Sequence, residues 1–174
     1  MDDSSSSNGS AANSDTITLG SVTTNSGTAA AYGEAEVAGF KLAVDEINAK
    51  GGINGKKVKL ESMDDKGDAT EASNAFNKLA GDNSVLGVVG PTISSTTAAV
   101  APLADQPKLP AIAPAATSDS IETGGYMFRT CFKDSYQGEI AAKFAAETLK
   151  VKKVAVLYGT GDPYSSGVGK AFAA

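Results

Sequence analysis

The sequence alternates short runs of β-branched and other apolar residues with longer amphipathic segments, and this alternation constrains the fold more than any other feature. Strands that alternate with helical segments of roughly ten to fifteen residues are typical of βαβ units, in which consecutive strands run parallel. The run 85–89 is almost wholly apolar, as expected of a strand that helices cover on both faces. The sequence therefore predicts an α/β fold: a doubly wound parallel sheet with helices on both faces.

The same pattern indicates approximate limits for each element. Asp68 followed by Glu71 is typical of a capped helix start. In 135–150 we expect Ile140, Phe144 and Ala145 to face inward. The helix 34–48 carries its apolar face on Val37, Phe40, Val44 and Ile47. Predicted strands span 17–22, 58–63, 85–89, 109–113, 126–130 and 154–158, and predicted helices span 34–48, 68–80, 94–104, 135–150 and the residues after about 165.

Composition excludes several kinds of chemistry. The chain has no His, so a Ser-His-Asp triad, a Cys-His pair and imidazole metal ligands are all excluded. With one Cys, it can form neither an intrachain disulfide nor a CxxC redox pair. The net charge of -5 disfavours nucleic acid and anionic membranes, which bind clustered Lys and Arg. Most nucleophilic hydrolase and zinc chemistry is therefore excluded, and we expect no nucleic-acid partner.

Three features that could carry chemistry have simpler explanations. The Gly-Thr-Gly at 159–161 lacks the third glycine of a dinucleotide fingerprint. Asp64 and Asp65 have no third ligand loop nearby to complete an octahedral Mg²⁺ site, so capping and solvation explain them better. Cys131 lies beside Phe132 in an apolar stretch, where a free thiol behaves as a small hydrophobe, and we assign it no chemistry.

Hydroxyl side chains follow four of the predicted strands, in the loops 23–28, 90–97, 114–118 and 159–166. Ligands of parallel α/β sheets bind outside the carboxyl ends of the strands, where such loops gather. Hydroxyls and backbone N–H groups at helix starts can hold a small carboxylate without any Lys or Arg. Ser and Thr are also ordinary capping and turn residues, and the pattern alone leaves this structural explanation open.

Several motifs resemble the periplasmic binding proteins of branched-chain amino acid transporters. The most specific is Ile-Asn-Ala-Lys-Gly-Gly-Ile-Asn-Gly at 47–55. Further matches are Asp-Asp at 64–65, Gly-Pro at 90–91 leading to Ser-Ser-Thr-Thr at 94–97, Pro-Ala-Ala-Thr at 114–117, Arg-Thr at 129–130 and Asp-Ser-Tyr-Gln-Gly at 134–138. The resemblance covers residue 17 to the last residue, although the chain has about half the length of a full family member.

The resemblance implies a two-lobed receptor that closes on an amino acid and delivers it to an ABC transporter permease. It therefore implies a protein that is not an enzyme and that has no cofactor and no metal. Ser94 and Thr117 would hold the ligand's carboxylate and ammonium, and a backbone group of Ala115 would complete that contact. Tyr32 would pack on the ligand side chain, and Tyr164 would close over the ligand from the second lobe. Polar groups would thus bind the zwitterion common to all amino acids, while apolar walls select the side chain.

The resemblance also implies a domain division. Residues 1–15 would be a disordered tether, 16–130 the N-terminal part of lobe one, and 131–174 the hinge crossover with an incomplete start of lobe two. The first residues are rich in Ser and Asn, lack the apolar core of a signal peptide, and resemble the linker after the lipidated Cys of a bacterial lipoprotein. We therefore expect an extracytoplasmic protein, either membrane-anchored or periplasmic.

Other functions fit the same gross pattern. A flavodoxin-like electron carrier would hold the phosphate of FMN in the 23–28 loop. A ligand sensor built on the receptor fold is a further alternative. A strand at 154–158 would leave one edge and one apolar face uncovered, so we also expect the chain to self-associate through 129–174 or to leave that segment disordered.

Overall fold

The computed structural model describes residues 15–121 and 125–174 and contains a five-stranded parallel sheet of order β2-β1-β3-β4-β5. The proposed tether at 1–15 therefore lies, apart from Asp15, outside the described residues. The strands are β1 (Thr16–Thr23), β2 (Lys57–Asp64), β3 (Val85–Val89), β4 (Ala111–Ala113) and β5 (Met127–Arg129). The helices are η1 (Gly27–Ala29), α1 (Ala30–Ala49), α2 (Ala69–Ala80), α3 (Ser94–Asp105), η2 (Asp119–Ile121), α4 (Asp134–Lys143), η3 (Phe144–Thr148) and α5 (Pro163–Ala173).

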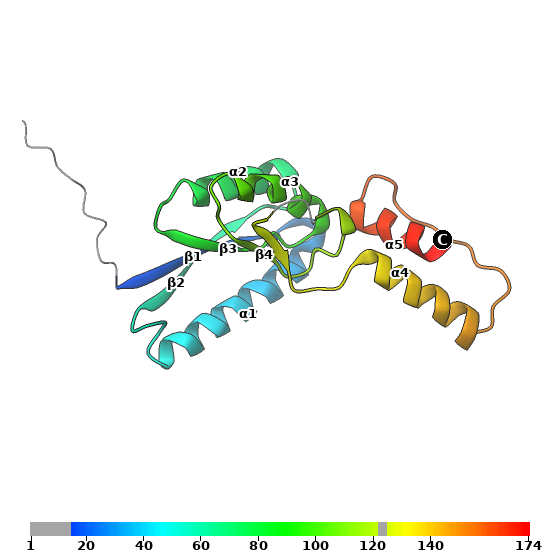
Figure 1. Cartoon of the computed structure of the whole chain (residues 1–174), viewed down its shortest axis with the longest axis horizontal. Helices are drawn as coiled ribbons and strands as arrows, with labels where there is room; N and C mark the ends of the chain where they lie inside the picture. The colour runs from blue at the N-terminus through cyan, green and yellow to red at the C-terminus, as the bar shows by residue number, and fades with distance from the viewer. Residues whose placement is uncertain (1–14, 122–124) are drawn as a thin grey trace, which may run out of the picture.

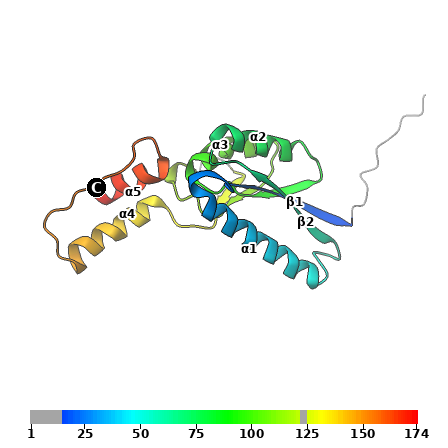
Figure 2. The ribbon, with the colours of Figure 1, turned by 180° about the vertical axis from the view of Figure 1, so that it is seen from behind.

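Helices lie on both faces of the sheet, as the sequence predicts. Figures 1 and 2 show α1 on one face and the pair α2 and α3 on the opposite face. The helices α4 and α5 lie side by side beyond the sheet, at the end where the strands finish. The predicted doubly wound parallel α/β fold is confirmed for this part of the chain.

The strand register brings the carboxyl ends of the strands to one edge. β1 pairs with β2 along its whole length, from Thr16 opposite Lys57 to Thr23 opposite Asp64. β1 also pairs with β3, which in turn pairs with β4. The loops that follow these strands therefore share one edge of the sheet, where parallel α/β proteins bind their ligands.

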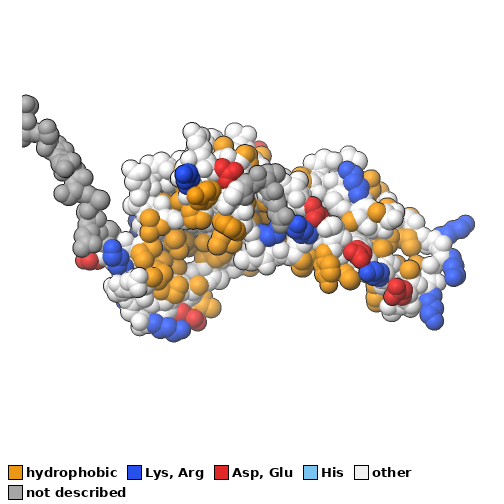
Figure 3. Space-filling model, in the orientation of Figure 1, with side chains coloured by type: hydrophobic (Ala, Val, Ile, Leu, Met, Phe, Trp, Pro, Cys, Tyr) orange, Lys and Arg blue, Asp and Glu red, His pale blue; other side chains and the backbone are white. Residues whose placement is uncertain are grey.

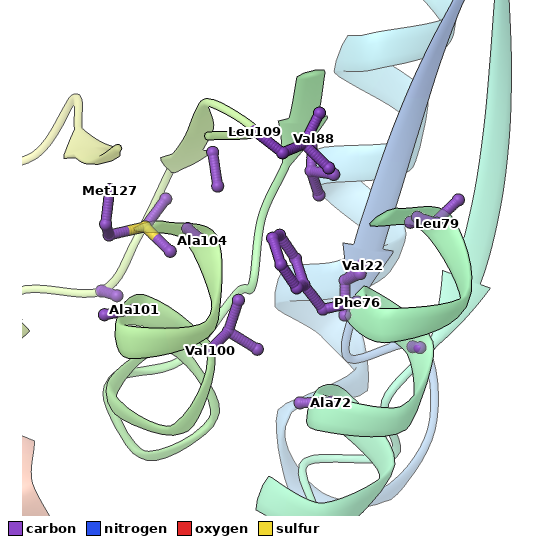
Figure 4. Packing of buried hydrophobic residues seen from close by; sticks show 14 of the residues in the cluster. Val22, Ala72, Phe76, Leu79, Val88, Val100, Ala101, Ala104, Leu109 and Met127 are labelled. Atoms are coloured by element: carbon purple, nitrogen blue, oxygen red, sulfur yellow. The ribbon is translucent and has the colours of Figure 1, made fainter. Parts of the chain in front are cut away.

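The hydrophobic core lies between the sheet and the helices α2 and α3. Phe76 and Leu79 from α2 and Val100 from α3 are fully buried against strand residues such as Val22 and Val88. Figure 4 shows the Phe76 ring directed from α2 toward Val88 and Val100. Burying one such side chain contributes about 1.5–3 kcal/mol, so this layer accounts for much of the fold's stability.

Two helix predictions are confirmed in detail. The Asp68 carboxylate caps α2 by accepting hydrogen bonds from Thr70 N at 2.8 Å and Glu71 N at 2.9 Å. The predicted apolar face of α1 is its more buried side, although its residues are only half-buried. Pro102 lies inside α3 and does not end it, since α3 continues to Asp105.

The prediction of a strand at 154–158 is wrong. This segment has no regular structure, and Leu157 is 100% exposed. A strand requires a neighbour with which to exchange backbone hydrogen bonds, and no described strand lies beside this one. Residues 154–158 therefore have the composition of a strand but do not form one.

The prediction that Ile140 and Phe144 face inward is also wrong. They are 45% and 53% exposed, while Ala145 is half-buried, and the α-helix gives way to a π-helical turn at Phe144. The helix instead packs on α5 through Gly138, where a Cβ would lie 2.5 Å from the Cβ of Ala171.

Among the described residues, no helix is both long enough and apolar enough to span a membrane.

Candidate ligand-binding site

A cavity of about 600 Å³ lies at the carboxyl edge of the sheet, between the strand loops and the first turn of α5. Its near wall consists of residues that follow β1, β3 and β4, and its far wall consists of Cys131, Phe132, Gln137, Asp162 and Tyr164. All the residues that the sequence analysis selected as ligand-binding line this one cavity: Tyr32, Ser94, Ala115, Thr117 and Tyr164.

Ser94 is placed by the start of α3. It is the first residue of that helix and is 4% exposed, so its hydroxyl lies where the positive end of the helix dipole meets the cavity. Its Oγ accepts a hydrogen bond from Ser118 N at 3.2 Å. Since that bond occupies an acceptor position, the hydroxyl proton of Ser94 remains available for an anion in the cavity.

Hydrogen bonds to the backbone carbonyl of Thr117 fix the position of this residue. That oxygen accepts hydrogen bonds from Arg129 Nη1 at 3.0 Å and from Asp134 N at 2.9 Å. The residue is nearly buried, at 8% exposed. Its position is therefore determined by contacts with β5 and α4, which lie far from it in the sequence.

Tyr32 extends from the first turn of α1 and is 64% exposed. The helix can begin there because Gly33 lies against the loop after β1: a Cβ on Gly33 would lie 2.0 Å from the carbonyl oxygen of Thr24. Any side chain at position 33 would therefore displace the start of α1 and move Tyr32. The close approach of helix and loop positions this ring at the cavity mouth.

Hydrogen bonds to α1 and to the loop after β1 hold the loop after β3 in place. Thr92 lines the cavity, and its Oγ1 donates to Glu36 Oε2 at 2.6 Å while accepting from Thr24 N at 3.0 Å. Burial raises the pKa of Glu36, and the hydrogen bond from Thr92 opposes that shift. This arrangement joins α1 to the loops that follow β1 and β3.

Tyr164 belongs to the far wall, at the start of α5. The carboxylate of Asp162 caps this helix by accepting from Tyr164 N at 3.3 Å and Ser165 N at 2.9 Å. The Tyr164 hydroxyl accepts a longer hydrogen bond from Gln137 Nε2, at 3.4 Å. Asp162 is the one charged residue among the described residues that line the cavity.

Several residues of the cavity are not among those predicted from the sequence. Thr28 and Thr92 belong to loops that are rich in hydroxyls, so the loops themselves are a usable signal. Cys131 also lines the cavity; burial raises the pKa of its thiol, and its Sγ donates to Ala116 O at 3.3 Å. No sequence signal identifies Phe132 or Asp162, because only the folded chain brings them to this edge.

Asp64 and Asp65 accept the hydrogen bonds of a turn. Asp64 is exposed as expected, but the prediction of solvation is wrong for Asp65, which is 0% exposed. Asp64 Oδ1 accepts from Asn25 N and Lys66 N, both at 2.9 Å. The buried Asp65 accepts from the Thr24 hydroxyl at 2.6 Å and from Gly67 N at 2.9 Å. Within 15–121 and 125–174 no cluster of three or more acidic, Cys or His residues could hold a metal ion.

The structure thus combines a parallel α/β sheet with a hydroxyl-lined cavity at the carboxyl ends of its strands. The chain belongs to the periplasmic binding protein family, whose model matches residues 16–174. Membership of this family implies an extracytoplasmic protein. The family match and the similar structures give no support to a flavodoxin-like electron carrier.

Known relatives point to the same group of proteins. A Leu/Ile/Val-binding protein from Rhizobium johnstonii is 38% identical over 160 residues, which are 91% of this chain and 43% of that protein. The crystal structure of the branched-chain amino acid transporter substrate binding protein LivJ from Streptococcus pneumoniae, in complex with isoleucine, is 40% identical with a TM-score of 0.87. That similarity covers 91% of this chain and 46% of LivJ.

A second similar structure carries a different ligand. It is a solute binding protein of an ABC transporter from Rhodopseudomonas palustris in complex with 3,4-dihydroxybenzoic acid, 27% identical with a TM-score of 0.83. The similarity covers 91% of this chain and 43% of that one. The present chain thus spans less than half the length of the relatives it matches.

Proposed function

We propose that this chain is part of a receptor that binds an amino acid with a branched aliphatic side chain and delivers it to an ABC transporter permease. The chain supplies one wall of the binding site and part of the second wall. One observation carries the proposal: Ser94 and Thr117, from loops that follow different strands, line a single cavity with Tyr32 and Tyr164. The isoleucine bound to the similar LivJ protein supports it.

The cavity offers matching groups for each part of such a ligand. The Ser94 hydroxyl, at the start of α3, suits the carboxylate. Thr117 and the negative charge of Asp162 suit the ammonium. Apolar surface for the side chain comes from Tyr32, Ile93, Pro114, Ala115 and Phe132. Binding of this kind needs no bond to be made or broken, and we propose a function without catalysis.

Two alternatives share this site. The dihydroxybenzoic acid bound to the Rhodopseudomonas palustris protein favours an aromatic acid as a second ligand class. A receptor of the same fold can also report its ligand to a sensor instead of a permease. Calorimetry with leucine, isoleucine, valine and 3,4-dihydroxybenzoic acid separates the ligand classes, and co-purification with membrane components separates transport from sensing.

The decisive variant is Thr117→Ala. It removes a hydroxyl that would form a charge-assisted hydrogen bond, and we expect leucine affinity to fall about ten-fold to a hundred-fold, or roughly 1.5–3 kcal/mol. Thr70→Ala, at an exposed threonine of α2, is the matched control and should bind as wild type does. Unchanged leucine affinity in Thr117→Ala would refute this assignment.

We further propose that the 174-residue chain self-associates through 129–174. Side chains of α4 and of the segments before and after it are widely exposed, including Phe132, Tyr136, Phe144 and Leu157. Figure 3 shows hydrophobic side chains gathered over this part of the molecule and over the sheet beside α1. Exposed apolar patches recruit partners, so light scattering should report a mass above that of the monomer.

The location of the protein is proposed from the family and from composition. The Ser- and Asn-rich residues 1–15 would link the receptor to a lipidated membrane anchor. Metabolic labelling of the full-length protein with a fatty acid tests this, and a protein that is not labelled and is released freely from the cell envelope would contradict it.

A further inference from the structure

A buried carboxylate lies next to Thr117, a residue that lines the cavity. Asp134, the first residue of α4, is 0% exposed, and neither of its carboxylate oxygens accepts a hydrogen bond from a described residue. Burying an ionised carboxylate without a partner is costly, and here burial raises the pKa of Asp134. Such a group calls for a functional explanation, since a neutral residue of the same size would avoid that cost.

Asp134 is joined directly to the ligand-binding loop. Its backbone N–H donates to the carbonyl of Thr117 at 2.9 Å. The Thr117 hydroxyl also lies near the carboxylate, where it opposes the effect of burial on the pKa of Asp134. Thr117 lines the cavity and Asp134 does not, so the carboxylate can reach a ligand only through Thr117.

The opposite side of the carboxylate is closed by α5. A Cβ on Gly167 would lie 2.7 Å from Asp134 Oδ2 and 3.2 Å from Asp134 Cβ. Gly167 lies one helical turn after Tyr164, a residue of the far wall. Because α5 closes this side, Thr117 is the residue that joins the carboxylate to the cavity.

We propose that Asp134 is a positioning residue that makes the cavity selective for an α-ammonium group. When an amino acid is bound, the Thr117 hydroxyl turns its proton toward this carboxylate, which leaves the lone pairs of the Thr117 oxygen facing the ligand. An oxygen with its proton engaged elsewhere can only accept, so it pairs well with an ammonium donor. The negative charge behind it strengthens that bond. This inference rests on the proposed amino acid site and adds the reason why amines are preferred.

The test compares leucine with its α-hydroxy acid analogue, L-2-hydroxy-4-methylpentanoate, by calorimetry. Asp134→Asn keeps the size of the side chain and removes its charge. We expect leucine affinity to fall about ten-fold while affinity for the hydroxy acid stays the same, because only the ammonium depends on the charge. Glu147→Gln, at an exposed residue of η3, is the control for loss of one negative charge. Equal loss for both ligands, or no loss for either, would overturn the proposal.

A second measurement needs no ligand. In Thr117→Val the hydroxyl is lost with little change of shape, so the pKa of the Asp134 carboxyl, followed by carbon-13 NMR, should rise. The charged groups that also act on Asp134 are Asp119, Asp162 and Arg129, and they are the same in both proteins. An unchanged pKa would refute the contact. If wild type binds none of the amino acids, the proposed function fails, and this titration alone decides the role of Asp134.

Discussion

Residues 16–113 and residues 131–174 contain similar apolar residues but bury them very differently. In the first region, Phe76 lies between α2 and the sheet and is fully buried. In the second, Phe144 lies at the end of α4 and is 53% exposed. The comparison shows that an apolar pattern specifies a face, whereas burial requires a second element to cover that face.

The two regions also differ in how their elements pack. α2 contacts the sheet through large side chains that interdigitate. α4 and α5 contact one another at glycines, and a Cβ on Gly138 would lie only 2.5 Å from the Cβ of Ala171. Close backbone approach replaces side-chain burial in this helix pair, so we expect it to depend on small residues and to be the less stable region.

The largest expected effect breaks the core of the first region. Phe76→Ala removes a fully buried ring, and the free energy of unfolding should fall by about 3–5 kcal/mol. At a protein concentration low enough to keep the chain monomeric, the matched change in the second region, Phe144→Ala, should alter it by less than about 0.5 kcal/mol. Urea unfolding followed by circular dichroism measures both. A large loss in Phe144→Ala at that concentration would show that Phe144 is covered within the monomer.

A second pair of variants asks whether the regions unfold together. Asp68 and Asp162 cap α2 and α5 in the same manner, each with two N–H groups. Asp68→Ala should lower the global free energy of unfolding by about 1 kcal/mol. Asp162→Ala should leave that value unchanged and reduce only the hydrogen-exchange protection of α5. Equal effects on global stability would mean that α5 unfolds cooperatively with the sheet.

The smallest expected effect lies where the regions meet. Burial acts to raise the pKa of Asp119, but hydrogen bonds from the hydroxyl and N–H of Ser135 and nearby cations outweigh it, so the pKa lies below its ordinary value. A lowered folded-state pKa stabilises the fold above the unfolded-state pKa, and that contribution is lost as pH falls through the folded-state pKa.

Ser135→Ala should therefore reduce stability slightly at pH 7, and the difference from wild type should disappear as the pH falls below about 4. Solvent screening at this exposed pair keeps the effect small. Ser73→Ala is the control, because the Ser73 hydroxyl donates to the Ala69 carbonyl and to no carboxylate. Thermal unfolding over a range of pH measures both, and a difference that persists at low pH would contradict the role of Asp119.

Much of the first region could be predicted because its signals are local. The capped start of α2 at Asp68 and the apolar run of β3 depend on residues a few positions apart, and both are present where expected. The strand expected at 154–158 failed for the opposite reason. Its sequence satisfies the local pattern, but a strand forms only where a neighbouring strand completes its hydrogen bonds.

The candidate site divides in the same way. Motif resemblance within the chain was enough to select Tyr32, Ser94 and Thr117, and the hydroxyl-rich loops indicated the sheet edge where these residues lie. Only the tertiary structure brings Cys131, Phe132 and Asp162 to the same cavity, because their position depends on how α4 and α5 pack.

The sequence by itself determined the parallel α/β elements, since hydrophobic periodicity and helix caps act over a few residues. The tertiary structure decided which side chains share the cavity. It also placed the unpartnered carboxylate of Asp134 between Thr117 and Gly167, residues that precede and follow it by many positions. Burial and electrostatic environment are sums over neighbours in space, and those neighbours become defined only when the chain has folded.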